Sequence, residues 1–131
     1  MRRLVMGLLM VTLSASACAD WVKIGDSMDG KVHHYLDPAT IRKDGQRMRV
    51  VTLTDYDEPQ VISETQRFQS VKMQDAFDCA NQSGQHLSLT ALAGKMGTGA
   101  VVATEPRAAE VRKVLTDTPD EDMWKFVCAR K

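Results

Sequence analysis

The sequence predicts an α+β domain that is mainly β, with an antiparallel sheet of about six strands and one C-terminal helix. Short alternating apolar segments recur between turn-forming residues from Trp21 to Leu115, as is typical of antiparallel sheets. From Thr118 onward the apolar spacing becomes helical and follows a capping pattern. Cys79 lies in the predicted sheet and Cys128 in the predicted helix, so a disulfide between them would tie the helix to the sheet.

Residues 1–19 have the pattern of a signal peptide. Arg2 and Arg3 precede the apolar run Leu4 to Leu13, and small residues with two A-x-A cleavage patterns follow. The apolar run is about half of the roughly 20 residues that a membrane-spanning helix needs, and no later segment is as apolar or as long. We therefore expect an exported protein that does not span a membrane, with residues 20–131 forming a single domain.

Cys18 leaves two forms of the mature protein open. Cys18 is a candidate lipidation residue, and a lipid there would anchor the protein to the outer membrane. The lipobox position usually held by leucine is Ala15, which favours cleavage before Asp20 and a periplasmic or secreted protein. In an oxidising compartment the remaining pair, Cys79 and Cys128, is expected to form a disulfide.

The first half of the domain predicts three strands. The segments 21–24 and 32–36 predict a hairpin, and Asp37-Pro38 is expected to end its second strand because proline lacks an amide donor. Asp44-Gly45 is a preferred pair for a tight hairpin turn. The run 47–56 follows, with apolar residues on both faces, so it is expected to be a central strand that ends at Asp57-Glu58-Pro59.

The second half predicts further strands and the helix. Val71, Met73, Phe77 and Cys79 share one face of a segment that begins at Ser63, and 86–93, 100–104 and 111–115 are further strand candidates, with a glycine-rich turn over 94–99. Thr118 is the expected N-cap, with Pro119 at the first helical position and Glu121 completing a capping box. Apolar residues share one helical face: Met123, Phe126 and Val127, with Cys128 next to them.

Several of these segments resemble the surface-adhesin protein E family of exported Gram-negative proteins. The resemblance spans nearly the whole mature chain. The motifs that carry it are Val32 to Pro38 with Thr40-Ile41-Arg42, Val50 to Tyr56, Ser70-Val71-Lys72, Phe77-Asp78-Cys79, Gly94 to Val102, and Cys128. The resemblance implies a curved sheet of about six strands with the C-terminal helix held on its concave side by a disulfide. It also implies binding of host matrix proteins or haem, and a homodimer as one option.

The residues themselves point to few kinds of chemistry. The chain has 17 basic and 17 acidic residues with no basic cluster, which argues against nucleic acid as a partner. His33, His34 and Tyr35 are candidate haem or metal ligands, although neighbours on a strand point to opposite faces and cannot grip one ion together. His86 stands alone, and neither a calcium-loop nor a phosphate-loop pattern is met.

We therefore expect a non-enzymatic binding protein without a resident cofactor. No serine lies in a nucleophile-elbow pattern, and the two cysteines of the mature domain are expected to pair with each other. The leading interpretation is an adhesin-E-like domain that binds a protein or extracellular-matrix-type ligand through exposed edges or turns. The alternatives are a periplasmic protein that binds haem or another small ligand, and an envelope inhibitor or maintenance factor.

Overall fold

The computed structural model describes residues 19–131. The predicted signal peptide falls almost wholly in residues 1–18, and Cys18 falls there too, so both lie outside the described residues and stay predictions. Within the described chain, no helix is long and apolar enough to cross a membrane.

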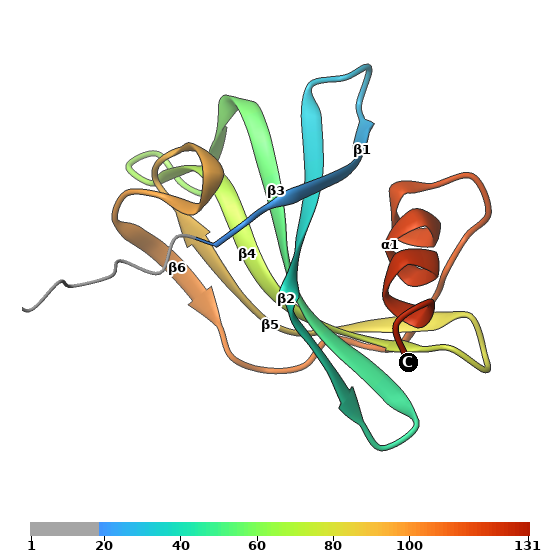
Figure 1. Ribbon diagram of the computed structural model, residues 1–131. Coiled ribbons are helices and arrows are strands. Elements are labelled where there is room, and N and C mark those ends of the chain that lie inside the picture. Colours follow the sequence, from blue (N-terminus) through green and yellow to red (C-terminus); the bar gives the residue numbers. More distant parts are fainter. Residues whose placement is uncertain (1–18) are drawn as a thin grey trace, which may run out of the picture.

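Residues 19–131 form one antiparallel sheet and a C-terminal helix (Figure 1). Strands β1 to β6 lie across the sheet in chain order, and β7 pairs with β5 on the same edge as β6. The helix, α1, lies in the hollow of the bent sheet (Figure 1), which confirms the predicted fold class. The elements are β1 (Val22–Ser27), β2 (Val32–Asp44), β3 (Arg47–Val61), β4 (Arg67–Asp78), β5 (Ser83–Leu92), the 3-10 turn η1 (Lys95–Gly97), β6 (Val101–Glu105), β7 (Arg112–Lys113) and α1 (Pro119–Cys128).

The expectation that Asp37-Pro38 ends a strand is wrong, because β2 continues through this pair. Residues 38–41 form a bulge opposite the single residue Val50, where the proline needs no ladder hydrogen bond. The Thr40 hydroxyl accepts a hydrogen bond from the Val51 amide at 2.8 Å, which replaces a bond that the bulge removes. The strand therefore bends at the bulge without ending.

Two other boundaries also differ from the expectation. β3 continues past Pro59, because its pairing with β4 skips from Asp55 to Gln60 and the proline lies in the unpaired part. The tight turn before β3 is at Gly45-Gln46, one residue later than expected, since Asp44 still pairs with Arg47. Gly45 has a φ of 60°, a left-handed conformation that glycine adopts without strain.

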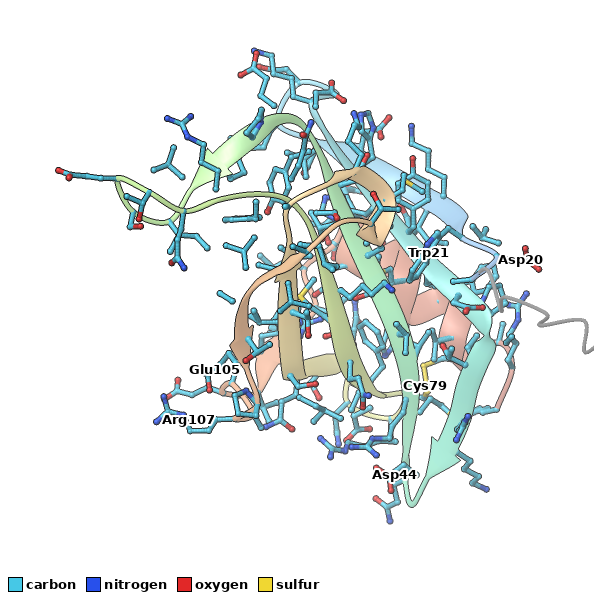
Figure 2. All side chains as sticks on the ribbon, turned by 90° about the vertical axis from the view of Figure 1, so that its left-hand side faces the viewer. Asp20, Trp21, Asp44, Cys79, Glu105 and Arg107 are labelled. Carbon is cyan, nitrogen blue, oxygen red and sulfur yellow. A yellow bond between two sulfur atoms is a disulfide. The ribbon has the colours of Figure 1, made fainter. Side chains whose placement is uncertain are left out.

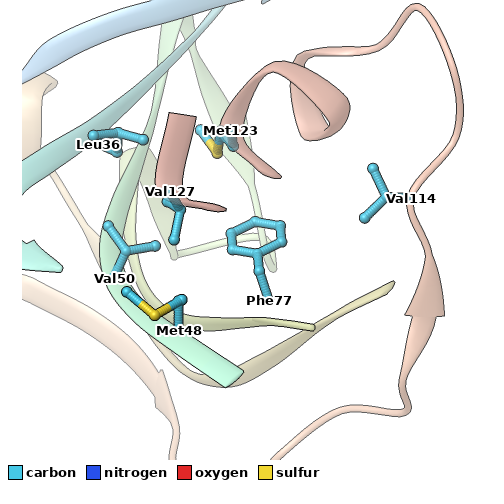
Figure 3. Close-up of a cluster of buried hydrophobic side chains, with 7 residues drawn as sticks. All are labelled: Leu36, Met48, Val50, Phe77, Val114, Met123 and Val127. Atoms are coloured by element: carbon cyan, nitrogen blue, oxygen red, sulfur yellow. The ribbon is translucent and has the colours of Figure 1, made fainter. Parts of the chain in front are cut away.

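The hydrophobic core lies between the hollow face of the sheet and α1 (Figure 3). Met48 and Val50 point into it from β3, which is the central strand that the sequence predicts. Each fully buried aliphatic or aromatic side chain contributes about 1.5–3 kcal/mol to folding. The core consists of Leu36, Met48, Val50, Phe77, Val114, Met123 and Val127.

The opposite face of β3 is covered by the turn between β5 and β6. The buried Asp55 carboxylate accepts a hydrogen bond from the Met96 amide at 2.7 Å. The Ser70 hydroxyl donates to the Gly94 carbonyl at 2.6 Å and accepts from the Gly97 amide at 2.9 Å. The glycine-rich segment is therefore a turn, as predicted, and it folds back onto the sheet and helps to bury β3 on this side.

The helix begins as the sequence predicts. The Thr118 hydroxyl accepts a hydrogen bond from the Glu121 amide at 3.2 Å, and Pro119 occupies the first turn of the helix. The reciprocal half of the capping box is not formed, because the Glu121 carboxylate accepts from the Asp117 amide and from Lys125. The N-terminus of α1 is thus held by both a hydroxyl and a carboxylate.

The predicted disulfide is present and joins the end of β4 to the end of α1. Cys79 and Cys128 are bonded, with their Cα atoms 5.6 Å apart. Beside them, Trp124 Nε1 donates to the Asp78 carbonyl at 2.9 Å. One covalent bond and one hydrogen bond therefore fix the helix over the core.

Candidate functional site

A cavity of about 500 Å³ opens between the hollow face of the sheet and the first turn of α1. We call it the concave pocket. Its volume is within the range of small-molecule sites. It is lined by Ser27, Met28, Val32, His34, Thr52, Thr54, Tyr56, Met73, Asp75, His86, Arg112, Asp120 and Met123.

The floor of the concave pocket contains a buried carboxylate. Asp75 is 2% exposed, and its two oxygens accept hydrogen bonds from the Thr52 hydroxyl, at 2.6 Å, and from His86 Nδ1. Because an ionised carboxylate only accepts, the His86 proton lies on Nδ1 in this contact. In the ring form with its proton on Nδ1, Nε2 carries a lone pair that can ligate a metal. A carboxylate behind the ring is the arrangement that orients and strengthens metal-ligating histidines.

A second pair closes the pocket beside α1. Arg112 donates from Nε and Nη2 to the Asp120 carboxylate at 2.9 and 2.7 Å, so β7 is joined to the first helical turn. Burial lowers the pKa of Arg112, but Asp120 and Asp75 outweigh it, and the pKa is raised overall. Arg112 Nη1 is buried without a hydrogen-bond partner among residues 19–131 and lies 3.9 Å from Asp75 Oδ1. A Cβ at Gly84 would approach this guanidinium within 3.0 Å.

The predicted trio His33, His34 and Tyr35 is divided between the two faces of β2. His34 lines the concave pocket and shares a hydrogen bond of 2.8 Å with the Ser27 hydroxyl. Burial lowers the pKa of His34, which favours its neutral form. Tyr35 pairs with Leu53 and, by strand alternation, shares the other face with His33.

His33 is engaged by two acids outside the pocket. Its Nδ1 lies 2.6 Å from Asp26 and its Nε2 lies 2.8 Å from Asp57. The hydrogen bonds with Asp26 and then Asp57 raise the pKa of His33, because both nitrogens can donate only in the protonated ring. The structure thus gives His33 a role in joining β1, β2 and β3.

The structure places His34 and His86 on the lining of one cavity, which the sequence did not predict. The sequence contains one indication of a polar site on this face. Asp75 is an acidic residue on the face of β4 that otherwise carries Val71, Met73 and Phe77. A carboxylate on a buried face needs a polar partner, and β5 supplies it. No group of three or more potential metal ligands occurs in the described part of the chain.

Comparisons with known proteins give a consistent result. The family model described as Surface-adhesin protein E matches residues 21–129. A structure of Haemophilus influenzae protein E in its selenomethionine form is similar with a TM-score of 0.65 and 16% identity, covering 83% of this chain and 85% of that one. The structure of protein E from non-typeable Haemophilus influenzae is similar with a TM-score of 0.64 and 14% sequence identity, and the match covers 88% of this chain and 79% of that one. No curated protein matches. The structural likeness supports the same fold, and the match over residues 21–129 places this chain in the surface-adhesin protein E family.

Proposed function

We propose that this protein is an exported, non-enzymatic adhesin that binds a protein ligand through one end of its sheet. Family membership supports an adhesin-like role. The observation that carries the proposal is the exposure of three apolar side chains on the two turns at this end of the sheet. Met28 is 73% exposed, Val61 61% and Ile62 44%. We call these three residues the apolar end.

The apolar end has the character of an interaction surface. The turns after β1 and β3 lie at the same end of an antiparallel sheet, so Met28 and the pair Val61 and Ile62 face the same side of the molecule. A groove of about 180 Å³ begins at Met28 and runs past Tyr56. Tyr56 packs edge to face on Phe68, with ring centroids 5.6 Å apart, which stiffens the base of the hairpin. Apolar residues rimmed by polar ones mark protein interaction sites.

Substitution at the hairpin tip tests this proposal. The Val61→Ser/Ile62→Ser variant should lose binding to an immobilised decellularised epithelial matrix. The matched control is Val111→Ser/Leu115→Ser, because these residues are 64% and 61% exposed at a different place. Surface plasmon resonance should show weaker matrix binding for Val61→Ser/Ile62→Ser and unchanged binding for the control variant. Equal binding by both variants, or no matrix binding by the wild type, would contradict the proposal.

A second candidate function is the binding of haem or a similar small ligand in the concave pocket. The support for it is the presence of two imidazoles, His34 and His86, on the walls of one cavity, with Asp75 behind His86. Haem would supply an iron for which a neutral imidazole is a suitable ligand. A hemin titration should then give a shifted Soret band that His86→Ala removes and His33→Ala keeps, since His33 is engaged by acids elsewhere. An unchanged band in the wild type excludes this candidate.

A further inference from the structure

Two arginines face each other at the other end of the sheet. Arg42 of β2 is the direct cross-strand partner of Arg49 of β3. Like charges in this position destabilise a sheet. Arg49 has a single ion pair, to Asp44 at 3.4 Å, and Arg42 makes no ion pair within residues 19–131. Folding therefore places two arginine side chains opposite each other on one face of the sheet, and among residues 19–131 a single carboxylate, that of Asp44, forms an ion pair with either of them.

The bulge in β2 makes a cleft beside these arginines. Residues 38–41 leave the ladder opposite Val50, and a cleft of about 180 Å³ lies there. Its lining includes Thr40, Gln74 and both arginines. Gln74 pairs with Val51 across β3 and β4, and its amide adds a neutral donor to the two cationic ones. The cleft is smaller than the roughly 300 Å³ of a typical small-molecule site, so it suits one compact polar group.

A third arginine extends the positive surface along the hairpin. Arg47 lies two residues from Arg49 on the same face, which places it about 7 Å further along the strand. Its Nη1 donates to Gln85 at 2.7 Å. The acids on this face are Asp37, Asp44 and Asp78, of which Asp44 and Asp78 are the cross-strand partners of Arg47. The Asp37 carboxylate accepts a hydrogen bond from the Ala39 amide, and the Asp78 carboxylate accepts hydrogen bonds from residues 80 and 81 in the next turn. Arginines and acids are therefore equal in number on this face, but the Asp37 and Asp78 carboxylates are engaged by amide groups, which leaves Arg42 without an ion pair among residues 19–131.

We propose that this cleft binds a sulfate or phosphate group of an anionic polysaccharide. A guanidinium fork donates two parallel hydrogen bonds to such an oxyanion, and an anion between Arg42 and Arg49 would relieve their repulsion. The cleft holds one group, and Arg47 is placed to meet a second. A chain with repeated anionic groups binds such a row more tightly than a single ion does, because later contacts are intramolecular.

This assignment is independent of the apolar end and of the concave pocket. Asp44, at the tip of the hairpin that carries the arginines, lies at the bottom of Figure 2, to one side of Glu105 and Arg107. Arg107 pairs with Glu105, and Arg67 lies at the start of β4, near the apolar end. These two arginines therefore provide a control with the same change of net charge.

The test measures binding of heparin and of a phosphorylated yeast mannan by isothermal titration calorimetry at several salt concentrations. The Arg42→Gln/Arg49→Gln variant should bind at least about tenfold more weakly than the wild type, and Arg67→Gln/Arg107→Gln should bind like the wild type. Asp44→Asn should bind more tightly, because it removes the competing acid. The affinity of the wild type should fall as salt rises.

The stability of the variants separates binding from a structural role. Without polyanion, Arg42→Gln should unfold at the same temperature as the wild type or higher, since a repulsive pair is lost. Binding of heparin alone assigns the site to sulfated chains, and binding of the mannan alone assigns it to phosphorylated ones. Desulfated heparin should not bind. No binding of either polymer, or an equal loss in the control variant, would overturn the proposal.

Discussion

Removal of the Cys79–Cys128 disulfide should lower the free energy of unfolding by about 4 kcal/mol. The bridge closes a loop with a sequence separation of 49. The chain-entropy relation at 25 °C gives about 0.6 kcal/mol for its constant term and about 3.5 kcal/mol for a loop of this length. The perturbation is the double variant Cys79→Ala/Cys128→Ala, which leaves no unpaired thiol in residues 20–131.

The folded state of this variant should change little. Met123 and Val127 are buried in the core beneath α1, and the Trp124 indole still has the Asp78 carbonyl as its acceptor. The loss therefore arises chiefly in the unfolded chain, which gains conformational freedom when the bridge is absent. The far-ultraviolet circular dichroism of the native protein should be unchanged.

Urea unfolding followed by fluorescence measures the effect. With a slope of about 2 kcal/mol per molar urea, the midpoint should fall by about 2 M. A reducing agent should move the midpoint of the wild type by a similar amount and leave the double variant unchanged. Equal midpoints for the oxidised wild type and the double variant would refute the reasoning, and an altered native circular dichroism spectrum would show that the bridge also holds the helix in place.

Three further predictions concern the core, the helix cap and an ionic cluster. Leu36→Ala should cost about 2–5 kcal/mol in urea unfolding, because Leu36 is fully buried and its loss leaves a cavity, and a cost below 1 kcal/mol would show that the core can close around it. Thr118→Ala should cost about 1 kcal/mol, because the Glu121 amide loses its acceptor, whereas Thr118→Asp should be nearly neutral. The pKa of His33 is raised in the folded protein. Its contribution to the stability of the fold is therefore complete when the pH is below the pKa of the unfolded chain, near 6.5, and is lost as the pH rises through the pKa of the folded protein. Melting temperatures of wild type and His33→Gln should therefore differ at pH 5.5 and converge at high pH, and a constant difference would contradict this account.

The sequence was sufficient for the features that depend on local patterns. Alternating apolar residues predicted the central strand 47–56, and Thr118-Pro119 predicted the start of the helix. Cysteine count and expected export predicted the Cys79–Cys128 bond, which the structure contains. The same reasoning failed at Pro38 and Pro59. A local rule expects proline to end a strand, but both prolines lie in bulged, unpaired parts of their strands, where no ladder hydrogen bond from proline is needed.

The candidate sites depended on tertiary structure. His33 and His34 are adjacent in sequence, yet alternation of side chains separates them, while pairing of β4 with β5 brings His86 to Asp75 on the floor of the pocket that His34 also lines.

By itself, then, the sequence determined the fold class and the covalent tether of the helix, because hydrophobic periodicity, capping and cysteine chemistry act over short distances or through composition. Tertiary structure alone decided that Arg42 would oppose Arg49 and that the two imidazoles would share a cavity. The physical reason is strand register, which depends on bulges and on the packing of the whole sheet, and a shift of one residue would turn every one of these side chains to the other face.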